Sequence, residues 1–380
     1  MSKNKIGTLE AIALILSALA PFTVISISRT FINELKSSAL LNIIYISIIC
    51  TLIIYFIYAL FKNFPGFDII DISNYIGGSI FKNIIGFVFI AYFIITSAML
   101  LRNFCEGLKV IYYPYTDITY IILLFIITIT IANKLGFDST IKTTTLIFPF
   151  LLVSILLLFI GNLSNFSFEK MFPFMGDGFK KTFILGLSNI GSFTGITYIY
   201  FIPPLLKKPE QFKKICLLSI ILSSFFILIC VATLLFMFPI YINTDEIMPL
   251  FSVSRNIEFG NFFQRFESLF LLIWSISFCC YLSISLKFAN CIFCKIYNLS
   301  DASQTIDIIS ILTFVIALLP HNYSISYFFE TYIYRFITIG IIFLGFCILL
   351  LSNYKKNFYY YFNIYFYHIF FIFLYSLEYW

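Results

Sequence analysis

Two polar interruptions within long apolar stretches are the places where this sequence can do chemistry. The first runs from Ser17 to Thr23 around Pro21, and the second runs from Gly186 to Gly195 and contains three glycines. Proline lacks an amide donor and glycine weakens a helix, so backbone groups should lose their intrahelical partners at both places. Free amides at a helix start suit a carboxylate, and free carbonyls at a helix end suit an ammonium group. A zwitterionic amino acid would satisfy both.

The candidate ligand-binding residues therefore lie at the two interruptions, and they are Ala18, Ala20, Pro21, Phe22, Thr23, Ser188, Asn189, Gly191 and Ser192. A polar stripe further along the chain adds Ser275 and Cys279, which recur at helical spacing and continue to Ser283. Small and polar residues in a membrane helix also serve close packing, and a single proline commonly only kinks a helix. The sequence leaves both interpretations open.

The elements that must position these residues are about ten apolar stretches, each long enough to cross the roughly 30 Å hydrocarbon core of a bilayer as a helix. Hydrophobic residues make up 61% and charged residues 11% of the chain, which excludes a water-soluble fold. We predict an all-α polytopic membrane protein in contact with the lipid bilayer. The spans are expected at about residues 9–28, 39–61, 83–104, 118–135, 143–161, 183–203, 215–239, 264–287, 305–320 and 333–351.

The two interruptions fall in spans one and six, which are equivalent members of two five-helix halves. Broken helices at matching positions indicate an inverted-repeat transporter fold with its ligand site between the breaks. We predict one transmembrane domain over residues 1–352, with halves at about 8–162 and 183–352. The aromatic-rich tail at 353–380 is expected to be either an interfacial helix or an extension without a site.

The distribution of basic residues predicts the orientation in the membrane. With a cytoplasmic N-terminus, fourteen of the 24 Lys and Arg residues lie on the cytoplasmic side, including the dense cluster from Lys207 to Lys214. Both termini are then cytoplasmic. Basic joints facing anionic lipid headgroups account for the net charge of +6, so no nucleic-acid partner is expected.

Reactive side chains are too sparse for a metal centre or an enzyme. Cys291 and Cys294 form a CxxC pair, but a zinc site needs two more ligands and the only histidines are His321 and His368. The sequence also contains neither a GxSxG nucleophile motif nor a phosphate-binding Walker loop. We therefore predict no metal, no cofactor and no enzymatic activity.

Two separated motifs carry a resemblance to a known family. The run from Asn63 to Ile72, NFPGFDIIDI, resembles the FPG-(x)-D-(I/L)-x-(D/E)-I element of the spore germination receptor B subunits, the GerAB-type members of the amino acid/polyamine/cation transporter superfamily. The run from Phe262 to Trp274 is similar to that family's F-x-(Q/E)-R-(F/I/L)-E start of span eight. Physically, a turn at Pro65 and Gly66 would place Asp68 and Asp71 on one face of a short interfacial helix.

The resemblance implies a LeuT-like 5+5 fold and a role in sensing a small germinant in the spore inner membrane, together with an A subunit and a lipoprotein C subunit. An amino acid is the expected germinant. Many members of the family break span one at G-(S/T)-G, and this chain lacks both glycines there. The alternative function is an autonomous amino acid transporter coupled to H⁺ or Na⁺.

Overall fold

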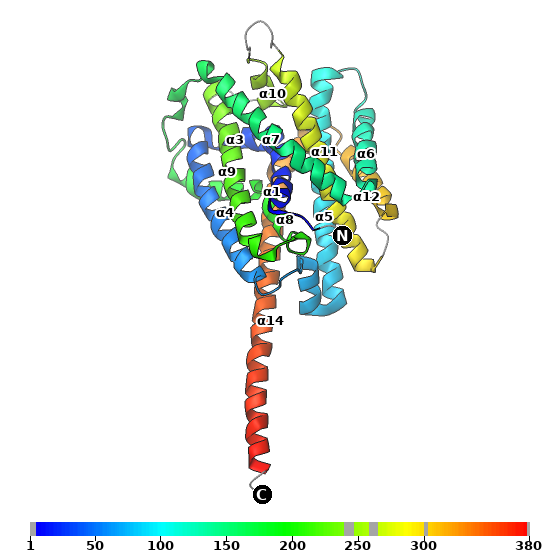
Figure 1. The fold of residues 1–380 in the computed structure, drawn as a ribbon. Helices are drawn as coiled ribbons and strands as arrows, with labels where there is room; N and C mark the ends of the chain where they lie inside the picture. The colour runs from blue at the N-terminus through cyan, green and yellow to red at the C-terminus, as the bar shows by residue number, and fades with distance from the viewer. Residues whose placement is uncertain (1–4, 239–246, 258–264, 300–302, 378–380) are drawn as a thin grey trace.

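A computed structural model describes residues 5–238, 247–257, 265–299 and 303–377. The described part is almost entirely helical and forms one bundle, from which a single long helix projects at one end (Figure 1). An isolated parallel bridge between Ile6 and Leu206 joins the start of the chain to the segment after span six.

The helices of the first half of the bundle begin with a broken span one. They are α1 (Thr8–Ser17), α2 (Ala20–Phe22), a π-helical turn (Thr23–Ile27), α3 (Ser28–Leu35), α4 (Ala39–Phe61), α5 (Ile69–Tyr112), α6 (Ile118–Lys134) and α7 (Phe137–Gly161).

The second half begins with a span six that is largely not α-helical. It comprises a π-helical turn (Lys180–Ile184), a 3₁₀ segment (Leu185–Ser192), α8 (Gly195–Ile199), α9 (Phe212–Met237), α10 (Pro249–Ser254), α11 (Phe266–Tyr297), α12 (Ser303–Leu318), α13 (Tyr323–Phe328), a π-helical turn (Phe329–Ile333) and α14 (Tyr334–Leu377).

Length and hydropathy show that this is a multi-pass membrane protein. Within the described ranges, six helical stretches are long and apolar enough to cross a bilayer, and two shorter apolar helices cover the predicted spans four and nine. Span ten differs from the prediction, because its apolar stretch begins at Tyr323 and not near residue 333. Asn322 starts this helix by accepting a hydrogen bond from the amide of Ile325, which the sequence analysis overlooked.

The start of α5 follows from local sequence. Asp68 caps the helix by accepting hydrogen bonds from the amides of Ile70 and Asp71, and the Asp71 carboxylate accepts from the Asp68 amide in return. Gly78 has a φ of 66°, which favours glycine, and it separates this first short helix from the long membrane-crossing part of α5. The predicted short helix after span two is therefore present.

The predicted tail continues span ten instead of forming a separate segment. α14 runs as one helix to Leu377, and its last turns extend beyond the bundle (Figure 1). Where it leaves the bundle, Asn353 and Lys356 bind Asn63, and Lys355 donates hydrogen bonds to the carbonyls of Tyr75 and Ile76.

The interior is built around α5, α11 and span one. α11 packs against α5 and α7, whereas α4 packs against α9, and α1 lies against α7, α9 and α11. Span one is consequently surrounded by protein along its length, and every residue from Ala11 to Ile32 is buried. The bundle thus places the broken span at its centre.

Candidate functional site

Span one is interrupted close to the predicted position. α1 ends at Ser17, a turn at Ala18 and Leu19 follows, and α2 starts at Ala20 with Pro21 in its first turn. A proline there costs little, because the first amides of a helix have no intrahelical partner. The next turn, Thr23–Ile27, is π-helical, so irregular backbone extends through the centre of the span.

Span six is interrupted at the same level of the bundle. Its 3₁₀ segment ends at Ser192, and Phe193 leaves the helical region with a ψ of 59° before α8 starts at Gly195. The hydroxyl of Thr194 donates a hydrogen bond to the carbonyl of Ala18, with an O–O distance of 2.6 Å. A Cβ on Gly195 would lie 2.9 Å from the carbonyl oxygen of Ile15, so only glycine allows this approach. The two breaks therefore touch.

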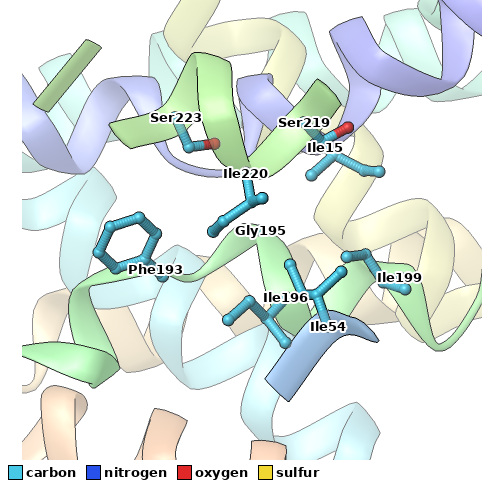
Figure 2. A pocket seen from close by; sticks show the side chains of 9 residues that line it. All are labelled: Ile15, Ile54, Phe193, Gly195, Ile196, Ile199, Ser219, Ile220 and Ser223. Atoms are coloured by element: carbon cyan, nitrogen blue, oxygen red, sulfur yellow. The ribbon is translucent and has the colours of Figure 1, made fainter. Parts of the chain in front are cut away.

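The space beside this contact is closed. Figure 2 shows the side chains of Ile15, Phe193 and Ser219 around a cavity of about 10 Å³. Such a volume holds one water molecule at most. An amino acid therefore does not fit at this point without movement of the surrounding helices.

Aromatic rings fill the centre of the bundle beside Pro21. Phe22 stacks on Tyr334 with ring centroids 4.7 Å apart and meets the edge of Tyr281 at 5.3 Å. Tyr92 lies next to Tyr334 at 6.3 Å, and its hydroxyl is 3.3 Å from the Thr338 hydroxyl. Sequence reasoning missed these tyrosines, although each is a polar-tipped ring inside an apolar span.

Two side chains of the segment around α10 lie between the break in span one and a large crevice. Met248 and Phe251 line a crevice of about 660 Å³, which Arg265 and Glu267 also line. The same two side chains line a cavity of about 10 Å³ that Pro21 borders from the other side. The crevice and the break in span one are thus separated by this apolar layer. Arg265 and Glu267 belong to the family-like run at the start of span eight and lie at the crevice. Phe262, Phe263 and Gln264 of the same run lie outside the described residues.

Asn189 and Gly191 form part of a network that joins span six to span ten. Arg335 donates hydrogen bonds from its guanidinium to the side-chain oxygen of Asn189 at 2.7 Å and to Glu34 at 2.7 and 2.8 Å. Asn189 in turn donates to Asn42 at 3.0 Å. A Cβ on Gly191 would lie 2.2 Å from the Arg335 carbonyl oxygen. These contacts fix the first part of span six against span ten and α4.

The structure brings together only some of the predicted ligand-binding residues. Ala18, Ala20, Pro21, Phe22 and Thr23 are all buried at the break in span one, and Ser192 is buried at the break in span six. Their role in binding a ligand stays a prediction.

Three other predicted residues lie apart from the breaks. Ser188 is half-buried and donates a hydrogen bond to its own helical turn at Leu185. Ser275 lines a separate crevice of about 570 Å³ beside Tyr112 and Tyr120, and Cys279, one turn further along α11, is half-buried. Phe22 is met by Tyr281 from α11, so a different face of that helix points to the centre.

A buried carboxylate on span ten is the main feature that sequence reasoning missed. Glu330 is 3% exposed, and the hydroxyl of Ser26 donates a hydrogen bond to it at 2.6 Å. The side-chain amide of Asn103 donates to its other oxygen. Predicting span ten from residue 333 left Glu330 in a joint between helices. The signal was the capping Asn322 followed by an apolar run, which would have placed Glu330 inside the span.

A second carboxylate cluster lies at the start of α5. The ammonium group of Lys295, on α11, contacts Asp68 at 2.5 Å and Asp71 at 2.8 Å. Burial raises the pKa of Asp68 to about 6, and the positive charge of Lys295 opposes this increase, so the carboxyl stays ionised at neutral pH. In the described ranges, no group of three or more His, Cys, Asp or Glu side chains is placed to hold a metal ion.

Comparison with known proteins identifies the family. Residues 5–326 match the spore germination protein family. The chain belongs to this family. It is 21% identical over 334 residues to spore germination protein B2 of Bacillus subtilis (strain 168), covering 87% of this chain and 90% of that protein. It is 22% identical over 274 residues to spore germination protein YndE of the same organism, covering 71% of this chain and 75% of that protein.

A solved structure confirms the fold. This member of the spore germination family superposes on a Na⁺-coupled sialic acid symporter, in a substrate-bound outward-open state, with a TM-score of 0.64 and 16% identity. The superposition covers 89% of this chain and 78% of the symporter. The predicted LeuT-like fold with broken spans one and six is therefore correct.

Proposed function

We propose that the protein is the membrane-embedded subunit of a spore germinant receptor, and that it senses a small nutrient, an amino acid, to trigger germination. The observation that carries the proposal is the contact between the two helix breaks at Thr194 and Ala18 in a spore germination protein. Breaks of this kind expose backbone amides and carbonyls that suit the two charged ends of an amino acid.

The closed centre supports a sensing mechanism based on a change of conformation. The cavity beside the breaks has room for one water, and Met248 and Phe251 separate Pro21 from the crevice that Arg265 and Glu267 line. Binding then requires that these side chains and the central rings move apart. A ligand that binds only the opened arrangement shifts the protein toward it, and this shift is the signal.

Partner subunits would receive that signal. We propose that the protein acts in the spore inner membrane, with cytoplasmic termini, beside an A subunit and a lipoprotein C subunit. Genes for both subunits next to this one would support the assembly, and purification of the three proteins as one complex from spores would test it directly.

The function is tested by deleting the gene in the spore-forming host. Germination is then scored as loss of optical density against single amino acids, sugars and salts. We expect loss of the response to one group of amino acids and recovery on complementation. Unchanged germination across the whole panel would contradict the receptor role.

A pair of variants tests the helix breaks within that experiment. T194V keeps the side-chain shape but removes the hydrogen bond to Ala18. Because that bond holds the closed arrangement together, we expect the half-maximal germinant concentration to fall about fivefold, corresponding to roughly 1 kcal/mol. The matched control is S188A, because the Ser188 hydroxyl donates its hydrogen bond within its own helical turn, to the carbonyl of Leu185. If both variants have the same half-maximal germinant concentration at normal membrane abundance, the ligand does not bind at the helix breaks.

The second candidate function is autonomous amino acid transport coupled to H⁺ or Na⁺. The fold shared with a Na⁺-coupled symporter favours it. Purified protein in proteoliposomes, without partner subunits, distinguishes the two. Uptake of a labelled amino acid driven by an ion gradient would support a transporter, and binding without uptake would support a receptor subunit.

A further inference from the structure

The Glu330 carboxylate connects three separate parts of the bundle. It lies in the π-helical turn of span ten, where it accepts hydrogen bonds from Ser26 of span one and from Asn103 of α5. The Ser326 hydroxyl, one turn earlier in span ten, donates to the Asn103 side-chain oxygen. Each side chain in the cluster is therefore oriented by another, and together they fix span one to α5 and span ten.

The donors to Glu330 are neutral, so the carboxylate charge is not balanced by direct contact. Among the described residues, the ion pairs within 4 Å do not include Glu330. An ionised carboxylate without a counter-charge is costly inside a membrane protein. Taking up a proton removes that cost.

The charged groups around the cluster have partners of their own, although the positive charge of Arg29 also acts on Glu330 from beyond ion-pair distance. Arg29 of α3 stacks on the Tyr327 ring at 3.8 Å and donates hydrogen bonds to the hydroxyls of Tyr327 and Tyr323. On α5, Arg102 pairs with Glu106 at 2.8 Å. On span ten itself, Arg335 pairs with Glu34.

The packing restricts which cation can bind. None of the cavities described above is lined by Glu330, Ser26 or Asn103. A sodium ion or an ammonium group would need space and further oxygen ligands. A proton needs neither.

We propose that Glu330 is a proton-binding site, and that its occupancy sets how tightly the part of span one after the break, residues 20–35, is held to α5 and span ten. The inference rests on the packing of this cluster and not on the proposed function. It applies equally to a receptor subunit and to a transporter.

The Ser26 hydroxyl provides the physical link between the proton and the helix. Its oxygen lies 2.6 Å from Glu330 and 3.3 Å from the carbonyl oxygen of Phe22, but it carries only one hydrogen. With Glu330 ionised, Ser26 donates to the carboxylate. A proton arriving from water stays on the carboxyl oxygen, which then donates to Ser26, and the Ser26 hydrogen turns to Phe22. Hydrogen bonds to a charged group are roughly twice as strong as neutral ones, so protonation loosens the connection between the helices.

Infrared difference spectroscopy tests proton binding without a germination assay. The full-length protein in lipid nanodiscs is titrated over roughly pH 5 to 9, a range that covers perturbed carboxyl groups. The signal is the C=O stretch of protonated carboxyl groups. We expect E330Q to lack one component of the titrating band that the wild type shows. The matched control is E106Q, which removes a carboxylate with its own ion-pair partner and should retain that component.

Two outcomes of the titration would overturn the proposal. One is a titrating band that is identical in the wild type and E330Q, and the other is a Glu330 component that does not change with pH. If E330Q fails to fold, S26A replaces it. Removing a donor to the ionised carboxylate should move the Glu330 component to higher pH, by about one unit, and no movement would contradict the hydrogen-bond link.

Hydrogen exchange at a fixed neutral pH tests the effect on span one. E330Q resembles the protonated state, so amides of residues 20–35 should exchange at least about fivefold faster than in the wild type, as expected from losing roughly 1 kcal/mol of local stability. E106Q should leave those amides unchanged. Equal protection in E330Q and the wild type would show that the proton does not control this helix.

Discussion

Asp68 and Glu330 are both buried carboxylates that hold separate helices together, but they differ in what surrounds them. Asp68 caps the start of α5 and contacts the ammonium group of Lys295 at 2.5 Å. Glu330 meets α5 near its other end, at Asn103, and its partners there and on span one are uncharged. In the first cluster a positive charge contacts the carboxylates directly, whereas the carboxylate of the second cluster is met by neutral donors alone among the described residues.

The difference separates a structural connection from a site that can respond. A carboxylate in contact with an ammonium group is favoured in its ionised form, so Lys295 holds α11 to the start of α5 at neutral pH. A carboxylate with only neutral donors has two states that differ in how strongly the helices are held. This contrast places the fixed contact at the predicted cytoplasmic end and the changeable contact beside the broken span.

The largest effect is expected when the counter-charge at Asp68 is removed. K295Q leaves two carboxylates close together, one of them 1% exposed, and should destabilise the protein by about 3 kcal/mol. Unfolding by denaturant titration in mixed micelles measures this. K134Q is the control, because Lys134 and Asp307 form a pair whose side chains are 50% and 42% exposed, and its cost should stay below about 1 kcal/mol. Similar losses in the two variants would show that the buried cluster at Lys295 contributes no more to stability than an exposed ion pair.

A smaller effect is expected when Glu330 loses a neutral donor. N103L removes the amide that donates to the buried carboxylate and should cost about 2 kcal/mol in the same unfolding measurement at neutral pH. The loss should shrink as the pH is lowered, since protonated Glu330 needs that donor less.

Asn133 offers a matched control for this substitution. It is buried too, yet neither polar atom of its side chain has a hydrogen-bond partner among the described residues. N133L should therefore be neutral or stabilising. An N103L variant as stable as N133L at all pH values would mean that Glu330 does not depend on Asn103.

The smallest effect is expected at Ser26. S26A should lower the free energy of unfolding by about 1 kcal/mol at neutral pH, because one donor to the carboxylate is lost. S47A is its control, since the Ser47 hydroxyl donates its hydrogen bond to the carbonyl of Ile43 within the same helix, α4. A cost that is independent of pH would indicate that Ser26 serves packing alone.

Local features of the sequence were sufficient to predict much of the fold. Long apolar stretches predicted the spans. Pro21 predicted the break in span one, and the glycines around Asn189 predicted the break in span six. The turn at Pro65 and Gly66 gave the short helix that carries Asp68 and Asp71. The spans, the two breaks and the short helix each depend on the conformational preferences of residues that are neighbours along the chain, so they can be predicted from a single sequence.

The candidate site could be predicted only in part. Residues at the break in span one were predicted and are buried at the centre, whereas Ser275 lies on a separate crevice. Asn189 was expected to face a ligand, but it binds Arg335 and Asn42. Helical spacing identifies residues on one face of a helix, and it does not say which neighbour that face meets.

The membrane class, the positions of the two breaks and the family all follow from the order of residues along the chain. Which charged groups meet depends on how the spans pack. Ser26 and Glu330 are 304 positions apart, and Asp68 and Lys295 are 227 positions apart. Such pairs form when distant spans pack side by side. The packing buries Asp68 against the counter-charge of Lys295, and it buries Glu330 among neutral donors, where the carboxylate can bind a proton.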